Sequence, residues 1–182
     1  MSSTVLTKKG NCDKIEMKTT ERGVKMKILV SACLLGEACR YDGKSKPCEA
    51  VLQLAKAHTL FPVCPEVMGG LPTPRIPSER QSDGSVKNAA GEDVTAAYKR
   101  GARKALAIAQ AEGINTAILK ERSPSCGCGK IYDGSFTGML TDGNGVTTDL
   151  LLENGIRVIG ESDVTTMTDP KNDRNASDGG TK

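Results

Sequence analysis

The chain has 182 residues, a formal charge of +3 and a hydrophobic content of 37%. This length suits one domain with a substantial core rather than two, and so small a charge does not by itself predict nucleic-acid binding. No apolar run approaches the roughly 18 residues that a membrane-spanning helix needs, and the N-terminus lacks the apolar core of a signal peptide. We therefore expect a cytoplasmic protein without a membrane partner.

Seven cysteines are the most informative feature of the composition. An odd number of cysteines without an export signal argues against a disulfide framework. In a reducing compartment, clustered cysteines are more often metal ligands or reactive thiols. Five of the seven lie in or beside the loops that follow three predicted strands, namely Cys33, Cys39, Cys64, Cys126 and Cys128.

The first part of the chain predicts an extension followed by two strands and a helix. Residues 1–25 are polar without a sustained period, so we expect a flexible N-terminal extension. A strand is predicted over 27–32, and a helix runs from a proline-containing first turn at about 47 to about 57. A second buried strand is expected over 60–64.

The middle of the chain alternates loop, helix and strand. Glycine and proline are dense over 67–79, which predicts an irregular loop that is packed down and walls the site. An exposed turn or short hairpin is expected over 81–91. Asp93 is a good N-cap for a helix that reaches Glu112 and stops at Gly113. A third strand follows over 114–120.

The last part predicts one more strand and a tail. We expect a loop or hairpin over 131–138, a helix over 146–153, a strand over 156–159 and a flexible tail over 165–182. Alternating strands and helices with short joints imply parallel pairing. The predicted fold is thus a single α/β domain over 26–164. It has a small, mostly parallel sheet of about four strands flanked by helices, with long Gly/Pro-rich active-site loops at the strand C-terminal ends.

Three cysteines share one sequence context. Cys33, Cys64 and Cys126 each follow an apolar run of strand length that ends in a loop rich in Gly, Pro or Ser. If these runs are neighbouring parallel strands, the thiols converge at the sheet edge where open α/β sheets bind ligands. No Cys-x-x-Cys pair occurs, which argues against a zinc finger. Full cysteine ligation of a [4Fe–4S] cluster takes four thiolates, so three suit a cluster with one iron open.

Other interpretations of the cysteines stay open at this point. Free cysteines are often simply small buried residues, although three at analogous strand ends make that reading less convincing. Cys39 would complete a set of four ligands and turn the site structural, and Cys128 is the other contender. Neither directly follows a strand, so both rank below the first three.

Polar residues in the same loops are candidates for catalysis or substrate binding. Glu66, two residues after Cys64, is a candidate general acid or base beside a dry metal site, and its alternative is an exposed loop carboxylate. Ser123 and Ser125 flank Pro124 and either bind a substrate or the cluster, or cap a turn. Cations near these loops are suited to a phosphate or carboxylate, unless they are merely solvated: Arg40, Arg75, Lys120 and Arg122.

Six phrases carry a resemblance to a known family. They are residues 30–36 (VSACLLG), 39–43 (CRYDG), 62–66 (PVCPE), 69–75 (GGLPTPR), 122–127 (RSPSCG) and 131–134 (IYDG). In this order they resemble the thiouracil desulfidases, a bacterial family formerly known only as a domain of unknown function. The resemblance covers roughly 27–164.

The resemblance implies an enzyme with an oxygen-sensitive [4Fe–4S] cluster. Its three ligands map to Cys33, Cys64 and Cys126. The implied reaction is a non-redox hydrolysis that converts a thiolated pyrimidine to its oxo form and releases hydrosulfide. Glu66 is then the acid/base residue and a serine of the 123–125 loop its partner. We assign Ser123 to that role and Ser125 to substrate binding with Arg40, Arg75 and Lys120, although the sequence alone does not separate the two serines.

The resemblance also suggests the substrate. It indicates 2-thiouracil or 4-thiouridine monophosphate, because relatives that act on thiolated tRNA carry an additional RNA-associated domain for which this chain has no room. We expect no stable nucleic-acid complex, and a monomer or homodimer. Two alternatives remain: a metal-binding or iron–sulfur sensing protein with Cys39 as fourth ligand, and a sulfur carrier that uses Cys64 or Cys126 as a persulfide.

Overall fold

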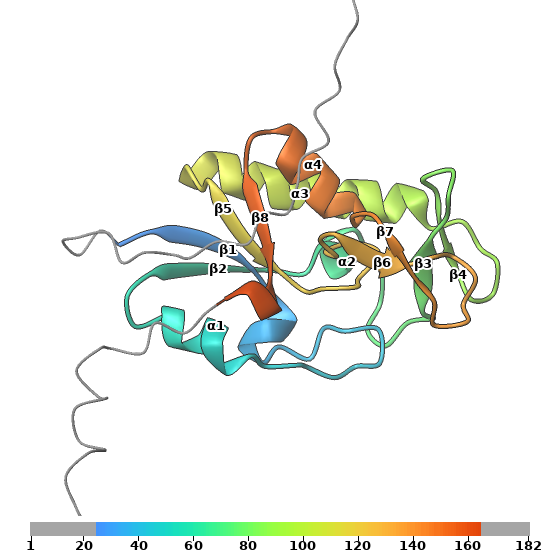
Figure 1. Cartoon of the computed structure of the whole chain (residues 1–182), viewed down its shortest axis with the longest axis horizontal. Helices are drawn as coiled ribbons and strands as arrows, with labels where there is room; N and C mark the ends of the chain where they lie inside the picture. The colour runs from blue at the N-terminus through green and yellow to red at the C-terminus, as the bar shows by residue number, and fades with distance from the viewer. Residues whose placement is uncertain (1–24, 165–182) are drawn as a thin grey trace, which may run out of the picture.

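The computed structural model describes residues 25–164, which form three layers around one sheet (Figure 1). The expected C-terminal tail lies outside the described residues, as does the expected N-terminal extension apart from Lys25. No helix within 25–164 is long and apolar enough to cross a membrane.

The central sheet has four strands, and every neighbouring pair is parallel. In sheet order the strands are β2 (Thr59–Val63), β1 (Lys27–Ser31), β5 (Thr116–Leu119) and β8 (Arg157–Gly160). This confirms the predicted α/β fold with a small parallel sheet. The sequence did not reveal the strand order, which places the first strand of the chain between the second and third predicted strands.

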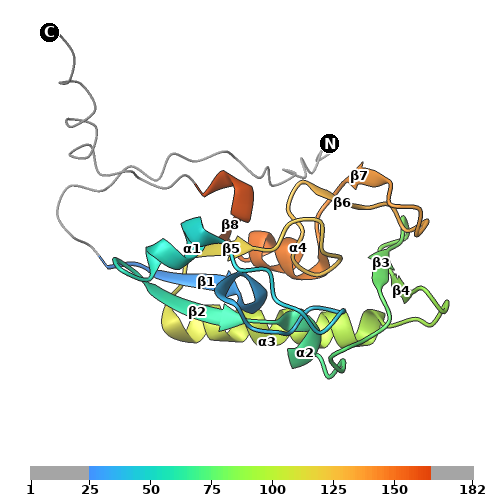
Figure 2. The same cartoon turned by 90° about the horizontal axis from the view of Figure 1, so that it is seen from below.

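Helices cover both faces of the sheet (Figures 1 and 2). One face packs against α3 (Thr95–Glu112) and α4 (Val146–Glu153), the other against α1 (Glu49–Leu54) and the short 3-10 helix η1 (Ala32–Leu35). Successive strand side chains point to opposite faces: in β1, Leu29 belongs to the first core, and Ile28 and Val30 belong to the second. Burial on both faces explains why the strands are nearly continuous apolar runs.

A close backbone contact fixes the one-turn helix α2 (Pro65–Met68) on α3. A Cβ added at Gly101 of α3 would lie 1.8 Å from the Pro65 carbonyl oxygen, and one at Gly69 would lie 2.1 Å from the Ala97 carbonyl oxygen. Lys104 of α3 also donates a hydrogen bond to the carbonyl of Met68, at 2.8 Å. The segment that follows Cys64 is therefore held rigidly at the end of the sheet.

Two antiparallel hairpins flank the carboxyl edge of the sheet (Figure 2). They pair β3 (Ser78–Arg80) with β4 (Val86–Asn88) and β6 (Lys130–Tyr132) with β7 (Leu140–Asp142), where the sequence predicted hairpins or loops. The buried carboxylate of Glu79 links them, because it accepts hydrogen bonds from the backbone N–H groups of Gly134 and Phe136, at 3.0 and 2.9 Å.

Some element boundaries differ from the prediction. The stretch 67–79 is not wholly irregular: it includes the end of α2, which Pro65 begins, and the start of β3. Proline suits the first helical position because its φ is already helical and its missing N–H has no helical partner. Val67 and Ile76 are 41% and 47% exposed rather than packed down. Helix α3 begins at Thr95, whose N–H binds the Asp93 carboxylate at 2.8 Å.

We predict that Gly101→Ala destabilises the protein through the α2–α3 contact. Alanine favours a helix by about 1 kcal/mol over glycine, but the new methyl group overlaps the Pro65 carbonyl, and overpacking costs about 1–3 kcal/mol. We expect a net loss in the free energy of unfolding, measured by urea denaturation. Gly143→Ala is the control, because its Cβ would lie at an ordinary 3.4 Å from the Ile131 side chain. Equal stability of the two variants would contradict the backbone contact.

Candidate active site

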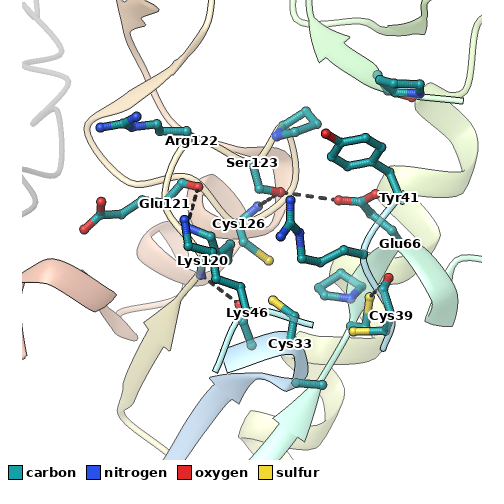
Figure 3. A pocket seen from close by; sticks show the side chains of 18 of the residues that line it. Cys33, Cys39, Tyr41, Lys46, Glu66, Lys120, Glu121, Arg122, Ser123 and Cys126 are labelled. Atoms are coloured by element: carbon teal, nitrogen blue, oxygen red, sulfur yellow. Dashed lines mark hydrogen bonds between the residues drawn. The ribbon is translucent and has the colours of Figure 1, made fainter. Parts of the chain in front are cut away.

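The three strand-end cysteines line one cavity of about 550 Å³ at the carboxyl edge of the sheet. Cys33 lies in η1, directly after β1, and Cys64 follows the last residue of β2. Cys126 lies in the loop after β5 and is 5% exposed. Figure 3 shows Cys33 and Cys126 beside the polar residues of the same cavity. The parallel strands thus bring together the three cysteines that the sequence singled out.

The loop that carries Cys126 is shaped by Ser123 and by the start of α4. Ser123 Oγ accepts hydrogen bonds from the N–H groups of Ser125 and Cys126, both at 3.1 Å. Thr148 Oγ1 donates to the Cys126 carbonyl at 2.9 Å. A Cβ at Gly145 would lie 2.3 Å from the Ser125 carbonyl oxygen. The backbone around Cys126 is therefore fixed on both sides.

Cys39 is a fourth thiol at the same cavity. Its thiol lies close enough to those of Cys33 and Cys64 to interact with both, and Cys64 Sγ donates a hydrogen bond to its carbonyl oxygen at 3.6 Å. Cys128 lies elsewhere: its sulfur is 3.7 Å from the Val158 carbonyl oxygen, and the residue packs against the core beneath α3 and α4. The structure thus separates the two contenders that the sequence ranked together.

The environment of these thiols disfavours an uncompensated negative charge. Burial raises the pKa of Cys126 to about 12. The contact with the Cys33 thiol raises the pKa of Cys39 to about 11. The contact with Cys39, followed by burial, raises the pKa of Cys64 well above its usual range. Thiolates at these positions need nearby positive charge, and bound metal ions supply it.

This donor set suits an iron–sulfur cluster better than a single metal ion. Across residues 25–164, no three side chains of His, Cys, Asp or Glu converge on a point that would hold one ion. In a [4Fe–4S] cluster each cysteine binds a different iron, so the ligands surround the group instead of converging. Thiols from three separate loops around one cavity fit that requirement.

Glu66 is largely enclosed and paired beside the cysteines (Figure 3). Its Oε2 accepts a hydrogen bond from Arg75 Nε at 2.8 Å and forms an ion pair with Nη2 at 2.7 Å, and its Oε1 accepts a hydrogen bond from Ser123 Oγ at 3.3 Å. The side chains of Glu66 and Arg75 are only 14% and 6% exposed. This excludes the alternative that Glu66 is an exposed loop carboxylate.

Arg75 differs from the substrate contact that we expected. Besides Glu66, its guanidinium binds the carbonyl oxygens of Cys39 and Pro72, both at 3.1 Å. Burial lowers the pKa of Arg75, but the Glu66 carboxylate outweighs this and raises the pKa overall, so the guanidinium stays charged. Arg75 lines the cavity, yet its hydrogen bonds go to the protein. It therefore holds Glu66 and the Cys39 loop in place.

Ser125 also differs from the expected substrate contact. Its side chain is fully buried, and its hydroxyl pairs with Thr147 Oγ1 at 2.9 Å, away from the cavity lining. Ser123 lines the cavity and contacts Glu66. The structure thus distinguishes two serines that the sequence left equivalent.

Comparisons with known proteins agree with this geometry. The model of the 2-thiouracil desulfurase family matches residues 28–163. The chain belongs to this family. The uncharacterized protein YbbK of Bacillus subtilis (strain 168) is 42% identical over 146 residues, which are 75% of this chain and 97% of YbbK. A solved structure described as the [4Fe-4S]-dependent thiouracil desulfidase TudS is 50% identical, with a TM-score of 0.70 over 76% of this chain and 92% of that chain. The predicted family membership is confirmed.

Basic side chains line the cavity, but two of them are paired with acidic side chains. Lys120 pairs with Glu161 and also binds the Glu121 carbonyl at 3.3 Å. Arg40 lies 3.5 Å from the Asp42 carboxylate and 5.7 Å from the centre of the Tyr41 ring. Figure 3 shows Lys46 and Arg122 at the same cavity. The cavity is therefore lined by charges of both signs, because four glutamates also line it: Glu66, Glu79, Glu121 and Glu161.

Sequence reasoning missed several polar residues of the cavity lining, and two of them, Tyr98 and Ser31, contact the residues of the proposed site. Tyr98 fits the apolar stripe of α3, yet it lines the cavity, and its hydroxyl contacts Glu66 and Ser78. Burial, followed by the Glu66 charge, raises the pKa of this phenol, which stays neutral. Ser31 accepts a hydrogen bond from the Lys120 N–H at 2.9 Å and contacts the Cys126 thiol. The position of Ser31, two residues before Cys33, was the one available signal.

We predict that Arg75→Met strongly lowers the free energy of unfolding of the iron-free chain. Removing one partner of a buried pair leaves the other charge uncompensated, which costs about 3–5 kcal/mol. Adding Glu66→Gln should recover part of this loss, measured by urea denaturation under reducing conditions. The control is Lys130→Met, because the Lys130–Asp142 side chains are 58% and 87% exposed and such pairs contribute about 1 kcal/mol or less. Similar losses for Arg75→Met and Lys130→Met would contradict this role of Arg75.

Proposed function

We propose that this protein is a [4Fe–4S]-dependent desulfidase that hydrolyses a thiolated pyrimidine to its oxo form and releases hydrosulfide. One observation carries the proposal: three thiols that suit a cluster share a cavity with a buried, hydrogen-bonded carboxylate. Membership of the 2-thiouracil desulfurase family and 50% identity to a solved desulfidase support it.

Cys33, Cys64 and Cys126 would hold the cluster, which leaves one iron without a cysteine ligand. When bound there, the cluster supplies a Lewis acid that polarises the thiocarbonyl group of the substrate. Water supplies the oxygen of the product, one of its protons leaves with sulfur as hydrosulfide and the other passes to solvent, so no electrons are exchanged. The chain's own side chains bind the substrate and move the protons.

Glu66 is the proposed acid/base residue, acting through one oxygen. Arg75 occupies Oε2 with a hydrogen bond from Nε and an ion-pair contact from Nη2, so Oε1 is the atom that exchanges a proton with water or the substrate. Ser123 donates its hydroxyl proton to Oε1 and accepts two backbone N–H groups. These contacts use the one donor and both acceptor lone pairs of the hydroxyl, so the role we propose for Ser123 is to hold Glu66 Oε1 at the cavity, where it meets the reacting water.

The proposed substrate is a free thiopyrimidine base or mononucleotide, such as 2-thiouracil or 4-thiouridine monophosphate, rather than a polynucleotide. Arg40 and Lys120 are the cations proposed for a nucleotide phosphate, because they line the cavity. We further propose that the protein works as a monomer or homodimer in the cytoplasm. Cysteines remain reduced in that compartment, as cluster ligation requires.

One observation favours a different function. Cys39 completes a set of four cavity thiols, which would suit a closed cluster in a binding or sensing protein. A closed cluster does not require a carboxylate beside it, whereas the largely enclosed Glu66 is hydrogen-bonded to Ser123 at the same cavity. The enzyme is therefore the better-supported function.

We predict that the three strand-end cysteines are each required for the cluster. Anaerobic reconstitution should give about four irons per chain and hydrosulfide release from 2-thiouracil or 4-thiouridine monophosphate. Cys33→Ser, Cys64→Ser and Cys126→Ser should lose iron and turnover. Cys39→Ser should keep turnover, and so should Cys48→Ser, the control outside the cavity lining.

Each other result points to a different function. Equal loss in Cys39→Ser would contradict the three-ligand assignment, and four irons without hydrosulfide release would favour sensing. Turnover that survives removal of iron by a chelator would favour a persulfide carrier, and a wild-type chain that takes up no iron would refute the desulfidase.

We predict that Glu66→Gln and Ser123→Ala lower turnover without loss of iron. General acid–base groups contribute about 10²- to 10⁴-fold, so turnover by Glu66→Gln should fall by at least about 10²-fold. The control is Ser125→Ala, which removes a buried hydrogen bond to Thr147 and should cost about 1 kcal/mol of stability with turnover nearly unchanged. A larger turnover loss in Ser125→Ala than in Ser123→Ala would reverse the serine assignment.

A further inference from the structure

Cys39 is held against Cys64 by the architecture of the site. The Cys39 carbonyl accepts a hydrogen bond from Arg75 Nη2 at 3.1 Å, and the Cys64 sulfur lies 3.6 Å from the same oxygen. The backbone of Arg75 also binds this loop, because the Arg75 N–H donates a hydrogen bond to the Tyr41 carbonyl at 2.8 Å. The loop that carries Cys39 is thus anchored at the position where its thiol meets the cavity.

The contacts of the Cys39 thiol single out one partner. It touches the thiols of both Cys33 and Cys64. Cys33 is only 7% exposed and packs in the core with η1 and α1, whereas Cys64 is partly exposed. Cys64 also contacts the Cys39 backbone. Of the two neighbours, Cys64 is the one that reagents in solvent reach more readily.

We propose that Cys39 is the disulfide partner of Cys64, and that this bond forms when oxidation has removed the iron. The part that concerns Cys64 as a cluster ligand rests on the proposed function. The two thiols together give up two protons and two electrons, and hydrogen peroxide takes these up to form two molecules of water. While iron is bound, the Cys64 sulfur is engaged and the disulfide cannot form.

The bond would preserve the cluster site. A ligand cysteine that loses its metal in the presence of peroxide proceeds from sulfenic to sulfinic acid, and the second step is generally irreversible. A neighbouring thiol that reacts with the sulfenic acid forms a disulfide with the ligand cysteine. A dithiol can reduce this disulfide and so restore the ligand. Cys39 is therefore a protective residue that ligates no iron.

The sequence allows a direct mapping experiment. The iron-loaded wild-type chain is treated with hydrogen peroxide until the iron is released, its free thiols are blocked with N-ethylmaleimide, and it is digested with trypsin. Cys33 and Cys39 then share the peptide 28–40, Cys64 lies in 57–75 and Cys48 lies in 45–56. A second cleavage after Glu37 separates Cys33 from Cys39, which leaves Cys39 in the fragment 38–40.

We expect most of the Cys64 peptide to be linked to the fragment 38–40, and dithiothreitol to release it. After reduction and reconstitution with iron and sulfide, Cys39→Ser should recover at least about threefold less iron than wild type, with Cys64 found as sulfinic acid. Cys48→Ser is the matched control and should recover like wild type, because Cys48 does not line the cavity.

Three results would overturn the proposal. The first is Cys39 labelled by maleimide in the oxidised wild type, and the second is a Cys64 peptide linked mainly to Cys33. The third is equal iron recovery in Cys39→Ser and wild type. A chain that takes up no iron would instead refute the proposed function. The link between Cys39 and Cys64 would still be measurable in that chain, so the two failures are distinguishable.

Discussion

The site depends on β1 lying between β2 and β5 in parallel register. Ser31 at the end of β1 pairs with Val63 at the end of β2, and Val30 pairs with Ile118 of β5. The three following segments therefore leave the sheet at one edge, where open α/β sheets bind ligands. The register is fixed because a shift by one residue would exchange the side chains between two differently shaped cores. Burial of the strands thus determines where the three thiols meet.

A chain of polar contacts then joins the three cysteine loops. The Cys39 carbonyl binds Arg75, Arg75 binds Glu66, Glu66 binds Ser123, and Ser123 Oγ receives the Cys126 N–H. Inside a protein such hydrogen bonds are strong and mutually reinforcing when every group is satisfied. Within the described part of the chain, no buried side-chain nitrogen or oxygen lacks a partner. The carboxylate is therefore placed before any substrate arrives, which is how a polar site lowers a barrier.

The sequence predicted the features that depend on periodicity, and missed those that depend on loop conformation. Strand–helix alternation was enough for the parallel sheet and for the convergence of Cys33, Cys64 and Cys126. Ser123 and Ser125 are equivalent in sequence because the partner that turns Ser125 inward, Thr147, lies 22 residues away. Arg75 looked like a substrate ligand because nothing local shows that its guanidinium folds back onto Glu66, nine residues earlier.

The buried Arg75–Glu66 pair also bears on the choice between an enzyme and a metal-binding protein. Taking two charges out of water is costly, and a buried ion pair is weak support for stability. Thiol ligation of a cluster does not require a carboxylate nearby. A carboxylate held at a cavity by an arginine on one oxygen, with its other oxygen directed toward a serine, is instead what proton transfer requires. The arrangement of this pair therefore favours the proposed acid/base role of Glu66 Oε1 over a purely metal-binding protein.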